Sequence, residues 1–268
     1  MTATQRFSAR QVAMLKEMGI PMWQAPWEAP AVQASISSLA TATPSLSPSP
    51  PAPAPPTVPA QPPTLQPAPE RIDTSGLDWS NLAKAVAECR ACSLSQSRTQ
   101  TVFGVGATGA QWMVVGEAPG EQEDLSGEPF VGAAGQLLDQ MLRSVGLTRS
   151  SDPQLDPGCQ VYIANTLKCR PPRNRNPERS EMSCCEPFLQ RQIELLQPKV
   201  ILAMGRFAVQ ALLRTEEAIG KLRGRVHRYQ GVSLIVTYHP AYLLRNLPDK
   251  AKAWDDLCLA LDTFRASS

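Results

Sequence analysis

The sequence lacks long hydrophobic runs and any broad excess of one charge. No stretch approaches the roughly 18 to 20 apolar residues that a membrane-spanning helix requires, and the N-terminus has no basic-then-apolar signal pattern. Lysine and arginine total 26 against 24 acidic residues, a net charge of +2. We therefore expect a cytoplasmic protein with no membrane segment, whose contacts with any nucleic acid come from local clusters of basic residues.

Charged residues are almost absent from residues 24–69, where Glu28 is the only one. The same segment holds most of the prolines, for example in the run at 50–56. Such a composition cannot bury enough apolar surface to offset the entropy cost of ordering the chain. We expect 24–70 to be a disordered linker, partly in the polyproline II conformation.

The segment ahead of this linker, residues 1–23, carries the signals of a short helix. Ser8 suits the N-cap, Gln11 follows three residues later, and Gly19 suits the C-terminal stop. An isolated helix of about a dozen residues is marginal in water, so its apolar face either packs on the globular domain or binds a partner. The long linker favours a protein partner, because a flexible linker lets a short peptide reach one. The run at 14–23 resembles the N-terminal segment of the bacterial polymerase psi subunit, so we expect residues 7–23 to bind a replication or repair protein.

Residues 71–268 are long enough for one sizeable core. Short apolar strands are expected at 112–115, 161–164, 200–203 and 234–237, and amphipathic helices at 78–91, 133–145, 178–196, 207–213 and 250–264. This alternation predicts an α/β fold, with a mostly parallel four-stranded sheet between two helical layers. Ligands of such sheets bind beyond the carboxyl ends of the strands.

Seven cysteines are present, and four of them are spaced like ligands. Cys89 and Cys92 form a C-x-x-C pair, whereas Cys169 and Cys185 bracket a loop rich in arginine, proline and asparagine. Buried apolar cysteines are the simpler interpretation, and we adopt it for the two that have no neighbour at ligand spacing, Cys159 and Cys258. For the four, a metal or an iron-sulfur cluster is favoured. Zinc remains open, because four-cysteine zinc sites are common.

Polar side chains follow the predicted strands. Glu117 lies in a Gly/Pro-rich loop after the first strand, Asn165 ends the second, and His239 follows the last. Each alone is compatible with a structural role, such as an ordinary turn. Together with Phe130, on which a planar ligand could stack, they predict a pocket that reads a flat polar ligand.

Two further loops favour nucleic acid as the ligand. The loop at 170–179 holds four arginines among prolines and asparagines, which makes it a rigid basic loop suited to phosphates; a solvated surface is the plainer alternative. The loop after His239 places Leu243 and Leu244 beside Arg245. We expect both leucines to be exposed there and to act as a wedge between stacked bases.

Four motifs together resemble a known family. They are GEAPGEQEDLSGEPFVGAAGQLLD at 116–139, YIANTLKCRPPRNRNP at 162–177, CEPFL at 185–189 and HPAYLLR at 239–245. In this order, over about residues 78–265, they resemble the family 4 uracil-DNA glycosylases, whose members carry a [4Fe-4S] cluster. The resemblance implies a monomeric enzyme of the uracil-DNA glycosylase fold that removes uracil from single- or double-stranded DNA and so starts base excision repair.

The resemblance also implies roles for residues. The cluster ligands would be Cys89, Cys92, Cys169 and either Cys184 or Cys185, the C-x-P-F-L context favouring Cys185. The catalytic residues would be Glu117 and His239, although the identity of the general base stays open, because Ala118 stands where single-domain uracil glycosylases carry an aspartate. The uracil-binding residues would be Glu117, Ala118, Pro119, Phe130, Asn165 and His239. The DNA-binding residues would be Arg170, Arg173, Arg175, Leu243 and Arg245.

Two other functions stay open. A related branch crosslinks to uracil-containing DNA through a histidine in an inserted basic loop, but residues 170–184 contain no histidine. An iron-sulfur electron carrier is less well supported, because a carrier needs no pocket of the size of a base beside its cluster.

Overall fold

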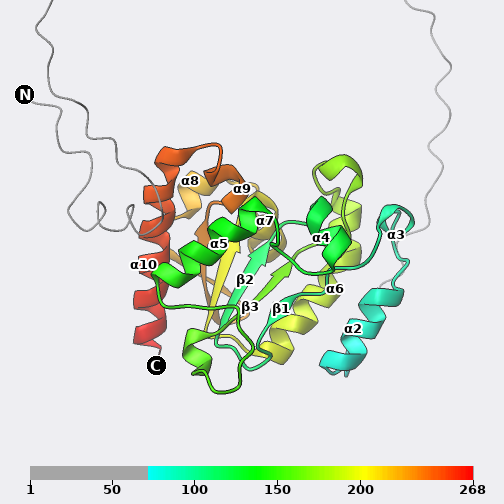
Figure 1. Ribbon diagram of the computed structural model, residues 1–268, viewed down its shortest axis with the longest axis horizontal. Helices are drawn as coiled ribbons and strands as arrows, with labels where there is room; N and C mark the ends of the chain where they lie inside the picture. Colours follow the sequence, from blue (N-terminus) through cyan, green and yellow to red (C-terminus); the bar gives the residue numbers. More distant parts are fainter. Residues whose placement is uncertain (1–71, 268) are drawn as a thin grey trace, which may run out of the picture. The chain divides into compact units, whose positions relative to one another are not determined.

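A six-stranded mixed sheet forms the centre of the computed structural model, which describes residues 72–267 (Figure 1). The strand order is β1-β3-β2-β4-β6-β5. The four inner strands run parallel to one another. They are β3 (Val161–Asn165), β2 (Trp112–Gly116), β4 (Val200–Met204) and β6 (Val232–Thr237). The predicted α/β class and its four parallel strands are confirmed.

Two antiparallel edge strands add to the predicted sheet. β1 (Val105–Gly106) pairs with β3, and β5 (Val226–Tyr229) pairs with β6. Neither has the apolar signal of a buried strand, because β1 is only two residues long and β5 alternates exposed and half-buried residues. Edge strands with one wet face have this character.

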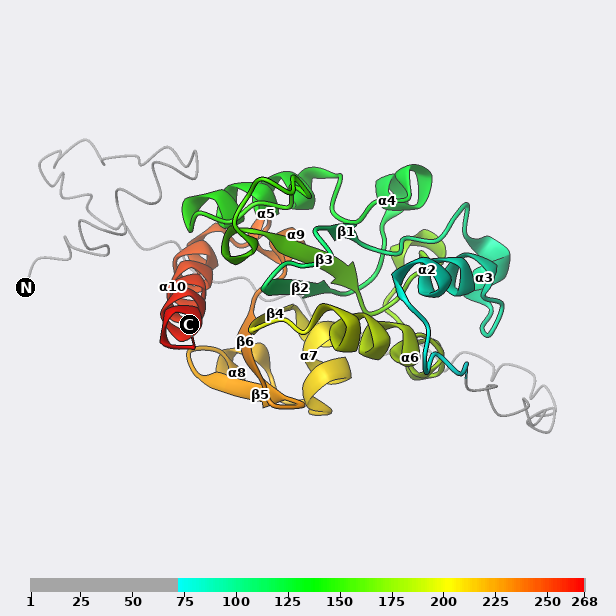
Figure 2. The same ribbon diagram turned by 90° about the horizontal axis from the view of Figure 1, so that it is seen from below.

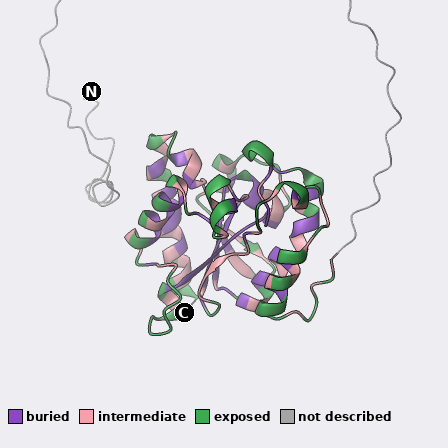
Figure 3. Cartoon of the chain, turned by 45° about the vertical axis from the view of Figure 1, so that its right-hand side comes forward, coloured by how far each residue is buried: buried purple, intermediate pink, exposed green. Residues whose placement is uncertain are grey.

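The parallel strands are apolar on both faces, and each face supports its own core. Trp112, Val114 and Ile163 belong to the cluster that packs on α5 and α10. Met113, Val115 and Ala164, the alternate residues, belong to the cluster that packs on α6 and α7. Figure 2 shows the two helical layers on opposite sides of the sheet, and Figure 3 shows buried strands at the centre with exposed outer helix faces. This is the predicted three-layer arrangement.

The predicted helices occur with shifts of a few residues at their ends. The helices are α2 (Trp79–Glu88), α3 (Leu94–Ser97), α4 (Glu121–Ser126), α5 (Ala133–Ser144), α6 (Arg179–Leu196), α7 (Arg206–Leu213), α8 (Ile219–Leu222), α9 (Pro240–Leu243) and α10 (Lys250–Ala266), with 3-10 turns at Pro157–Cys159, Pro172–Asn174 and Leu247–Asp249. The first helix ends at Glu88 rather than at 91, because Cys89 adopts an extended ψ of 135° and starts the C-x-x-C loop.

The carboxyl ends of the inner strands meet at one edge of the sheet. Gly116 is paired with Asn165, and Met204 with Thr237. The segments that follow these four positions therefore start side by side, and they contain Glu117, Gly205 and His239. The fold thus gathers the predicted site residues at the edge where parallel sheets bind ligands.

Among residues 72–267, no helix combines the length and the apolarity that crossing a membrane requires. The predictions for residues 1–23 and for the linker at 24–70 lie outside the described residues.

Candidate functional site

A pocket of about 200 Å³ opens at the carboxyl edge of the sheet. Its walls come from the loop after β2, the turn before α5, the end of β3, the arginine-rich loop and the start of α9. All six residues that the sequence predicted for a base pocket line it, namely Glu117, Ala118, Pro119, Phe130, Asn165 and His239. Gly120, Glu123, Ala134, Pro171, Asn174, Arg175 and Ala241 complete the lining.

Phe130 forms an aromatic wall of this pocket. Its ring stacks on the His239 imidazole, with ring centroids 5.4 Å apart and an interplanar angle of 29°. The ring also lies against Gly116, where an added Cβ would stand 2.7 Å from Phe130 Cζ. A side chain at position 116 would therefore displace the ring, which gives this glycine of the GEAPG motif a packing reason.

His239 is held as a neutral hydrogen-bond donor. Its Nδ1 accepts a hydrogen bond from the backbone N–H of Ala241 at 3.2 Å, since His239 is the N-cap of α9. An accepting Nδ1 carries no proton, so the neutral ring carries its proton on Nε2. Burial, together with the nearby Arg245 guanidinium, lowers the pKa of His239 to about 4. At neutral pH the imidazole is therefore uncharged and can donate from Nε2.

Two carboxylates line the pocket, and their surroundings differ. Burial raises the pKa of Glu117, and the positive charge of Arg206 offsets part of this rise. No hydrogen bond to the Glu117 carboxylate occurs within residues 72–267. Glu123, in contrast, accepts hydrogen bonds from the backbone N–H groups of Gly120, Val131 and Gly132 at 3.1 to 3.3 Å. The carboxylate of Glu117 is thus available to a ligand or a water molecule, whereas that of Glu123 is occupied.

Asn165 ends β3 with its side chain at the pocket. It is buried, and its backbone carbonyl accepts a hydrogen bond from Lys168 Nζ at 2.9 Å. Lys168 is itself buried and donates to Gln192 Oε1 at 2.6 Å. This buried network fixes the strand end that carries the Asn165 amide, a group that offers both a donor and an acceptor.

The predicted ligand cysteines gather from three segments. Cys92, Cys169 and Cys185 contact one apolar cluster together with Leu94 and Leu167. The thiols of Cys89 and Cys92 interact electrostatically with that of Cys169. Figure 1 shows α2 and α3, which flank the C-x-x-C loop, at one end of the fold beside α6.

Arg98 joins two of these cysteine segments. Its Nη1 donates to Cys169 Sγ at 3.0 Å, and its Nη2 donates to the backbone carbonyl of Cys89 at 2.9 Å. Within residues 72–267, no group of three or more His, Cys, Asp or Glu side chains is arranged to hold a single metal ion.

Cys184 and Cys185 differ in their hydrogen bonds. The Cys185 sulfur accepts from the backbone N–H of Lys168, and burial raises the pKa of the Cys185 thiol to about 12. The Cys184 thiol instead donates to the carbonyl of Ala91 at 3.5 Å. Burial therefore favours the protonated Cys185 thiol, whereas the N–H donor at its sulfur would stabilise a thiolate ligand. The carbonyl that faces the Cys184 sulfur would not stabilise a thiolate.

Comparison with known proteins assigns the family. Residues 103–258 match the model of the uracil DNA glycosylase superfamily. A type-4 uracil-DNA glycosylase of Pyrobaculum aerophilum is 39% identical over 202 residues, which cover 70% of this chain and 97% of the relative. Those of Archaeoglobus fulgidus and Thermotoga maritima are each 42% identical, over 172 and 167 residues, covering 61% and 62% of this chain and 82% of each relative.

This chain is a type-4 uracil-DNA glycosylase family member. The family assignment agrees with the resemblance found in the four sequence motifs, and the matched region contains the whole pocket.

One expectation from the sequence of this type-4 chain is wrong, namely that Leu243 is exposed in the loop after His239. Leu243 is 0% exposed and packs in the core that α5 and α10 share with the sheet. The reason is that Pro240–Leu243 folds as a short helix, which turns its last residue inward. Leu244, at 41% exposed, and Leu247, at 56%, are the exposed apolar residues of this part of the chain.

The predicted DNA-binding arginines of this type-4 chain differ in their availability. Arg175 makes a bidentate ion pair with the buried Glu181, at 2.6 and 2.9 Å. Arg170 donates to Asn174 Oδ1 at 2.8 Å. Arg173 and Arg245 are exposed, and within residues 72–267 their guanidinium groups make no hydrogen bond or ion pair. These two are the ones free to meet phosphates.

Two charged residues at or near the pocket of the type-4 chain were given no role from the sequence. Glu123 could have been found, because a glutamate three residues after the N-cap residue Gly120 can accept the N–H of that residue, which is the glutamate half of a capping box. Arg206 begins α7 directly after Gly205, the glycine that follows strand β4. Its positive charge offsets part of the rise that burial causes in the pKa of Glu117. No local motif shows that Arg206 approaches Glu117, since their nearness depends on the pairing of β2 with β4.

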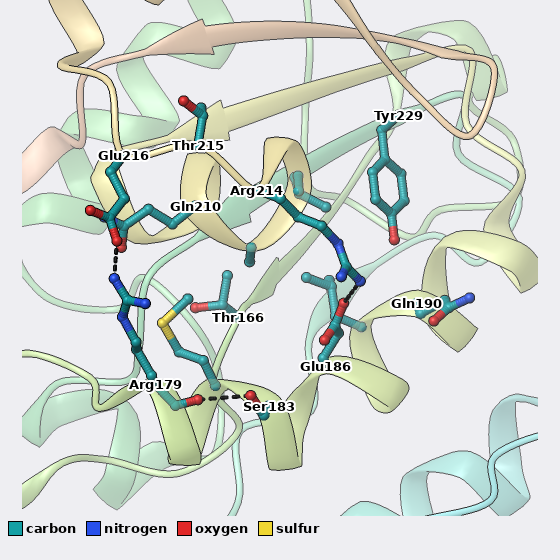
Figure 4. A pocket seen from close by; sticks show the side chains of 14 residues that line it. Thr166, Arg179, Ser183, Glu186, Gln190, Gln210, Arg214, Thr215, Glu216 and Tyr229 are labelled. Atoms are coloured by element: carbon teal, nitrogen blue, oxygen red, sulfur yellow. Dashed lines mark hydrogen bonds and ion pairs between the residues drawn. The ribbon is translucent and has the colours of Figure 1, made fainter. Parts of the chain in front are cut away.

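A larger cavity of about 320 Å³ lies apart from the base pocket, between α6 and α7. Figure 4 shows two ion pairs across it, Arg179 with Glu216 and Arg214 with Glu186. None of the six predicted base-pocket residues lines it. The charged groups of the larger cavity are paired with one another, whereas the smaller pocket has a carboxylate that a ligand can reach. The smaller pocket is therefore the better candidate for the functional site.

Proposed function

We propose that this chain is a uracil-DNA glycosylase, which hydrolyses the N-glycosidic bond of deoxyuridine in DNA and releases uracil. The product is an abasic site, the substrate of the next steps of base excision repair. The observation that carries the proposal is a single pocket, in a type-4 family member, that combines an aromatic wall, an amide, a neutral histidine donor and an available carboxylate.

The pocket suits a base that has been turned out of the DNA stack. Extruding a base costs a few kcal/mol, least in a mismatch or a single strand. The ring of Phe130 offers a stacking partner that compensates for part of this cost. Asn165 offers an amide donor and acceptor to the polar edge of uracil.

His239 would stabilise the departing uracil. When the C1'–N1 bond breaks, the bonding electrons leave with the base, and negative charge develops on the uracil ring while the sugar gains oxocarbenium character. The Nε2–H of the neutral His239 ring can donate a hydrogen bond to the O2 of uracil and keeps its proton while doing so. Donors fixed in advance toward developing charge are the strongest source of such stabilisation.

Glu117 would act on the sugar side. Its carboxylate is free of hydrogen bonds from within residues 72–267, and burial raises its pKa. In its ionised form it can stabilise the oxocarbenium-like sugar and orient the attacking water molecule, from which it can accept the proton. Glu123 cannot share this role, because its oxygens accept three backbone hydrogen bonds.

A [4Fe-4S] cluster bound by Cys89, Cys92, Cys169 and Cys185 fits the residues present. The thiols of Cys89, Cys92 and Cys169 interact with one another, and N–H donors reach the sulfurs of Cys169 and Cys185. Four-cysteine ligand sets of this kind hold such clusters. When bound, the cluster would supply a cross-link between the C-x-x-C loop, the start of the arginine-rich loop and α6.

DNA would lie over the pocket mouth. Arg173 and Arg245 would meet phosphates, with Arg170 beside the pocket, and Arg175 would support the loop through Glu181. Leu244 or Leu247 would fill the space that the extruded base leaves, in place of the buried Leu243. Neutralising phosphates makes such binding depend on salt.

An assay with alkali tests the proposed function against its alternatives. An end-labelled oligonucleotide with one uracil is incubated with the full chain and then heated in alkali. A glycosylase gives strand scission at the uracil, and a crosslinking protein gives an alkali-stable shifted band. No scission above the level of the uracil-free control strand would contradict the proposal.

Two further expectations complete the proposed function. We propose that the enzyme acts as a monomer, which light scattering on an eluting sample measures. Residues 7–23, which lie outside the described residues, would recruit a replication or repair protein. Retention of no such protein by a peptide of residues 1–30 would count against recruitment.

A further inference from the structure

The backbone of Phe130 adopts a conformation that phenylalanine rarely takes. Its φ is 56°, in the left-handed region. A residue other than glycine is strained in this region and persists there only where its surroundings impose the conformation. Other groups must therefore hold the Phe130 backbone in this conformation.

Arg149 holds the chain on one side of Phe130. Its Nη1 donates to the carbonyl of Pro129 at 3.1 Å and to that of Phe130 at 3.3 Å. Its Nε and Nη2 bind Asp139 Oδ1 at 2.7 and 2.6 Å. Asp139 lies on α5, so the guanidinium ties the two carbonyls to a helix of the core.

Glu123 holds the chain on the other side. Its Oε1 accepts from the N–H groups of Val131 and Gly132, the two residues that follow Phe130, while its Oε2 accepts from Gly120. The carboxylate therefore connects the turn that carries Phe130 to the loop that carries Glu117. Space is restricted as well, because a Cβ at Gly135 would collide with the Phe130 carbonyl.

We propose that Arg149 and Glu123 are positioning residues that hold the Phe130 ring where an extruded base stacks. Arg149 does not line the pocket and cannot touch the base, so its effect on catalysis must pass through the Phe130 backbone. This inference rests on the proposed function. It also gives a reason for the strained turn, because the turn keeps a stacking surface in place before the base arrives. Preformed stacking surfaces reduce the ordering that binding requires.

A double-mutant cycle with Arg149→Met and Phe130→Leu tests the inference through single-turnover release of uracil. We expect Arg149→Met to lower the rate constant about tenfold in the otherwise unchanged chain, as misplaced binding groups do. In the Phe130→Leu chain the same substitution should change the rate less than about twofold, because the ring that it positions is gone. Arg143→Met on the exposed face of α5 is the matched control and should leave the rate unchanged.

A second measurement reports the ring position without activity. The chain has two histidines, so ring-labelled histidine gives two sets of NMR signals, and Phe130→Leu identifies that of His239 through the loss of its stacked neighbour. Arg149→Met should move the His239 signals toward their positions in Phe130→Leu. Glu123→Gln, nearly the same size, should do the same if Arg149→Met folds poorly.

Each outcome has one meaning. Unshifted His239 signals in a folded Arg149→Met chain, His239 signals of Glu123→Gln that move away from their Phe130→Leu positions, or an equal fold-loss in both backgrounds of the cycle, would overturn the inference. A failure of the unmodified chain to release uracil would contradict the proposed function instead, and the His239 signals would still show whether Arg149 and Glu123 hold the ring.

Discussion

At the scale of single residues, the site depends on which polar atoms are already occupied. Glu117 and Glu123 are both pocket carboxylates six residues apart, yet only Glu123 is bound by backbone N–H groups. His239 likewise has one nitrogen occupied and one free. The sequence could propose Glu117 and His239 from their positions after strands, but it could not show these states, because they depend on contacts between separate loops.

The first prediction concerns pH. Glu117 must be ionised, and burial raises its pKa, so single-turnover uracil release should fall as the pH drops through a value above that of an ordinary glutamate. His239, with a pKa of about 4, stays neutral through this range. A pH–rate profile measures the acid limb, which Glu117→Gln should remove while lowering the rate. An identical acid limb in Glu117→Gln would assign it to another group.

The second prediction separates two adjacent leucines. Leu243→Ala should lower the free energy of unfolding by about 2 to 5 kcal/mol, because it opens a cavity in the core. Leu244→Ala should leave stability nearly unchanged and slow uracil release from duplex DNA about tenfold, with a smaller effect on single strands. Thermal unfolding and single-turnover rates measure both. Equal rates for Leu244→Ala and the unmodified chain on duplex DNA would indicate that Leu247, and not Leu244, fills the space that the base leaves.

At the scale of elements, apolar periodicity located the inner strands and the long helices well. It worked because both faces of the parallel sheet are covered, which makes β2, β3 and β4 continuously apolar. It missed α9, since the run that follows His239 was interpreted as an exposed loop, and it missed the two edge strands. The burial of Leu243 follows from α9, so one missed turn of helix changed a site residue.

The third prediction concerns α6. Cys185→Ala should remove most of the iron of the proposed cluster and lower the unfolding temperature, because the cross-link that the cluster would make among the three cysteine segments is lost. Cys184→Ala should keep the iron. Iron content and visible absorbance measure the difference, and unfolding gives an independent readout. If Cys184→Ala lost its iron and Cys185→Ala kept it, the ligand assignment would be reversed.

The fourth prediction concerns the arginine-rich loop. Arg173→Gln should weaken DNA binding and reduce the slope of log affinity against log salt by about 1, as the loss of one phosphate contact does. Arg175→Gln should instead lower the stability of the fold, since it leaves the buried Glu181 without its arginine partner. Binding titrations at several salt concentrations and denaturant unfolding separate the two variants. An unchanged salt slope for Arg173→Gln would remove that residue from the DNA contact.

At the scale of the whole molecule, one sheet edge brings together residues more than 120 positions apart in the chain, from Glu117 to His239. The family, the fold and the pocket composition could be predicted from four motifs, because three of them run through or follow a strand end and the fourth, CEPFL at 185–189, lies in α6. The contacts that hold the Phe130 turn could not be predicted in this way. Arg149 and Asp139 lie outside the pocket, and only the folded chain brings Arg149 next to the Phe130 carbonyl.

The release of free uracil tests the central claim most directly. The full chain is incubated in excess over DNA that carries one uracil, and free uracil and abasic sites are counted on the same sample. We expect equal numbers of both, and an Asn165→Ala chain of unchanged stability should release uracil at least tenfold more slowly, because the base loses its polar partner. No free uracil from the unmodified chain, or an equal rate for Asn165→Ala, would contradict the account of this pocket.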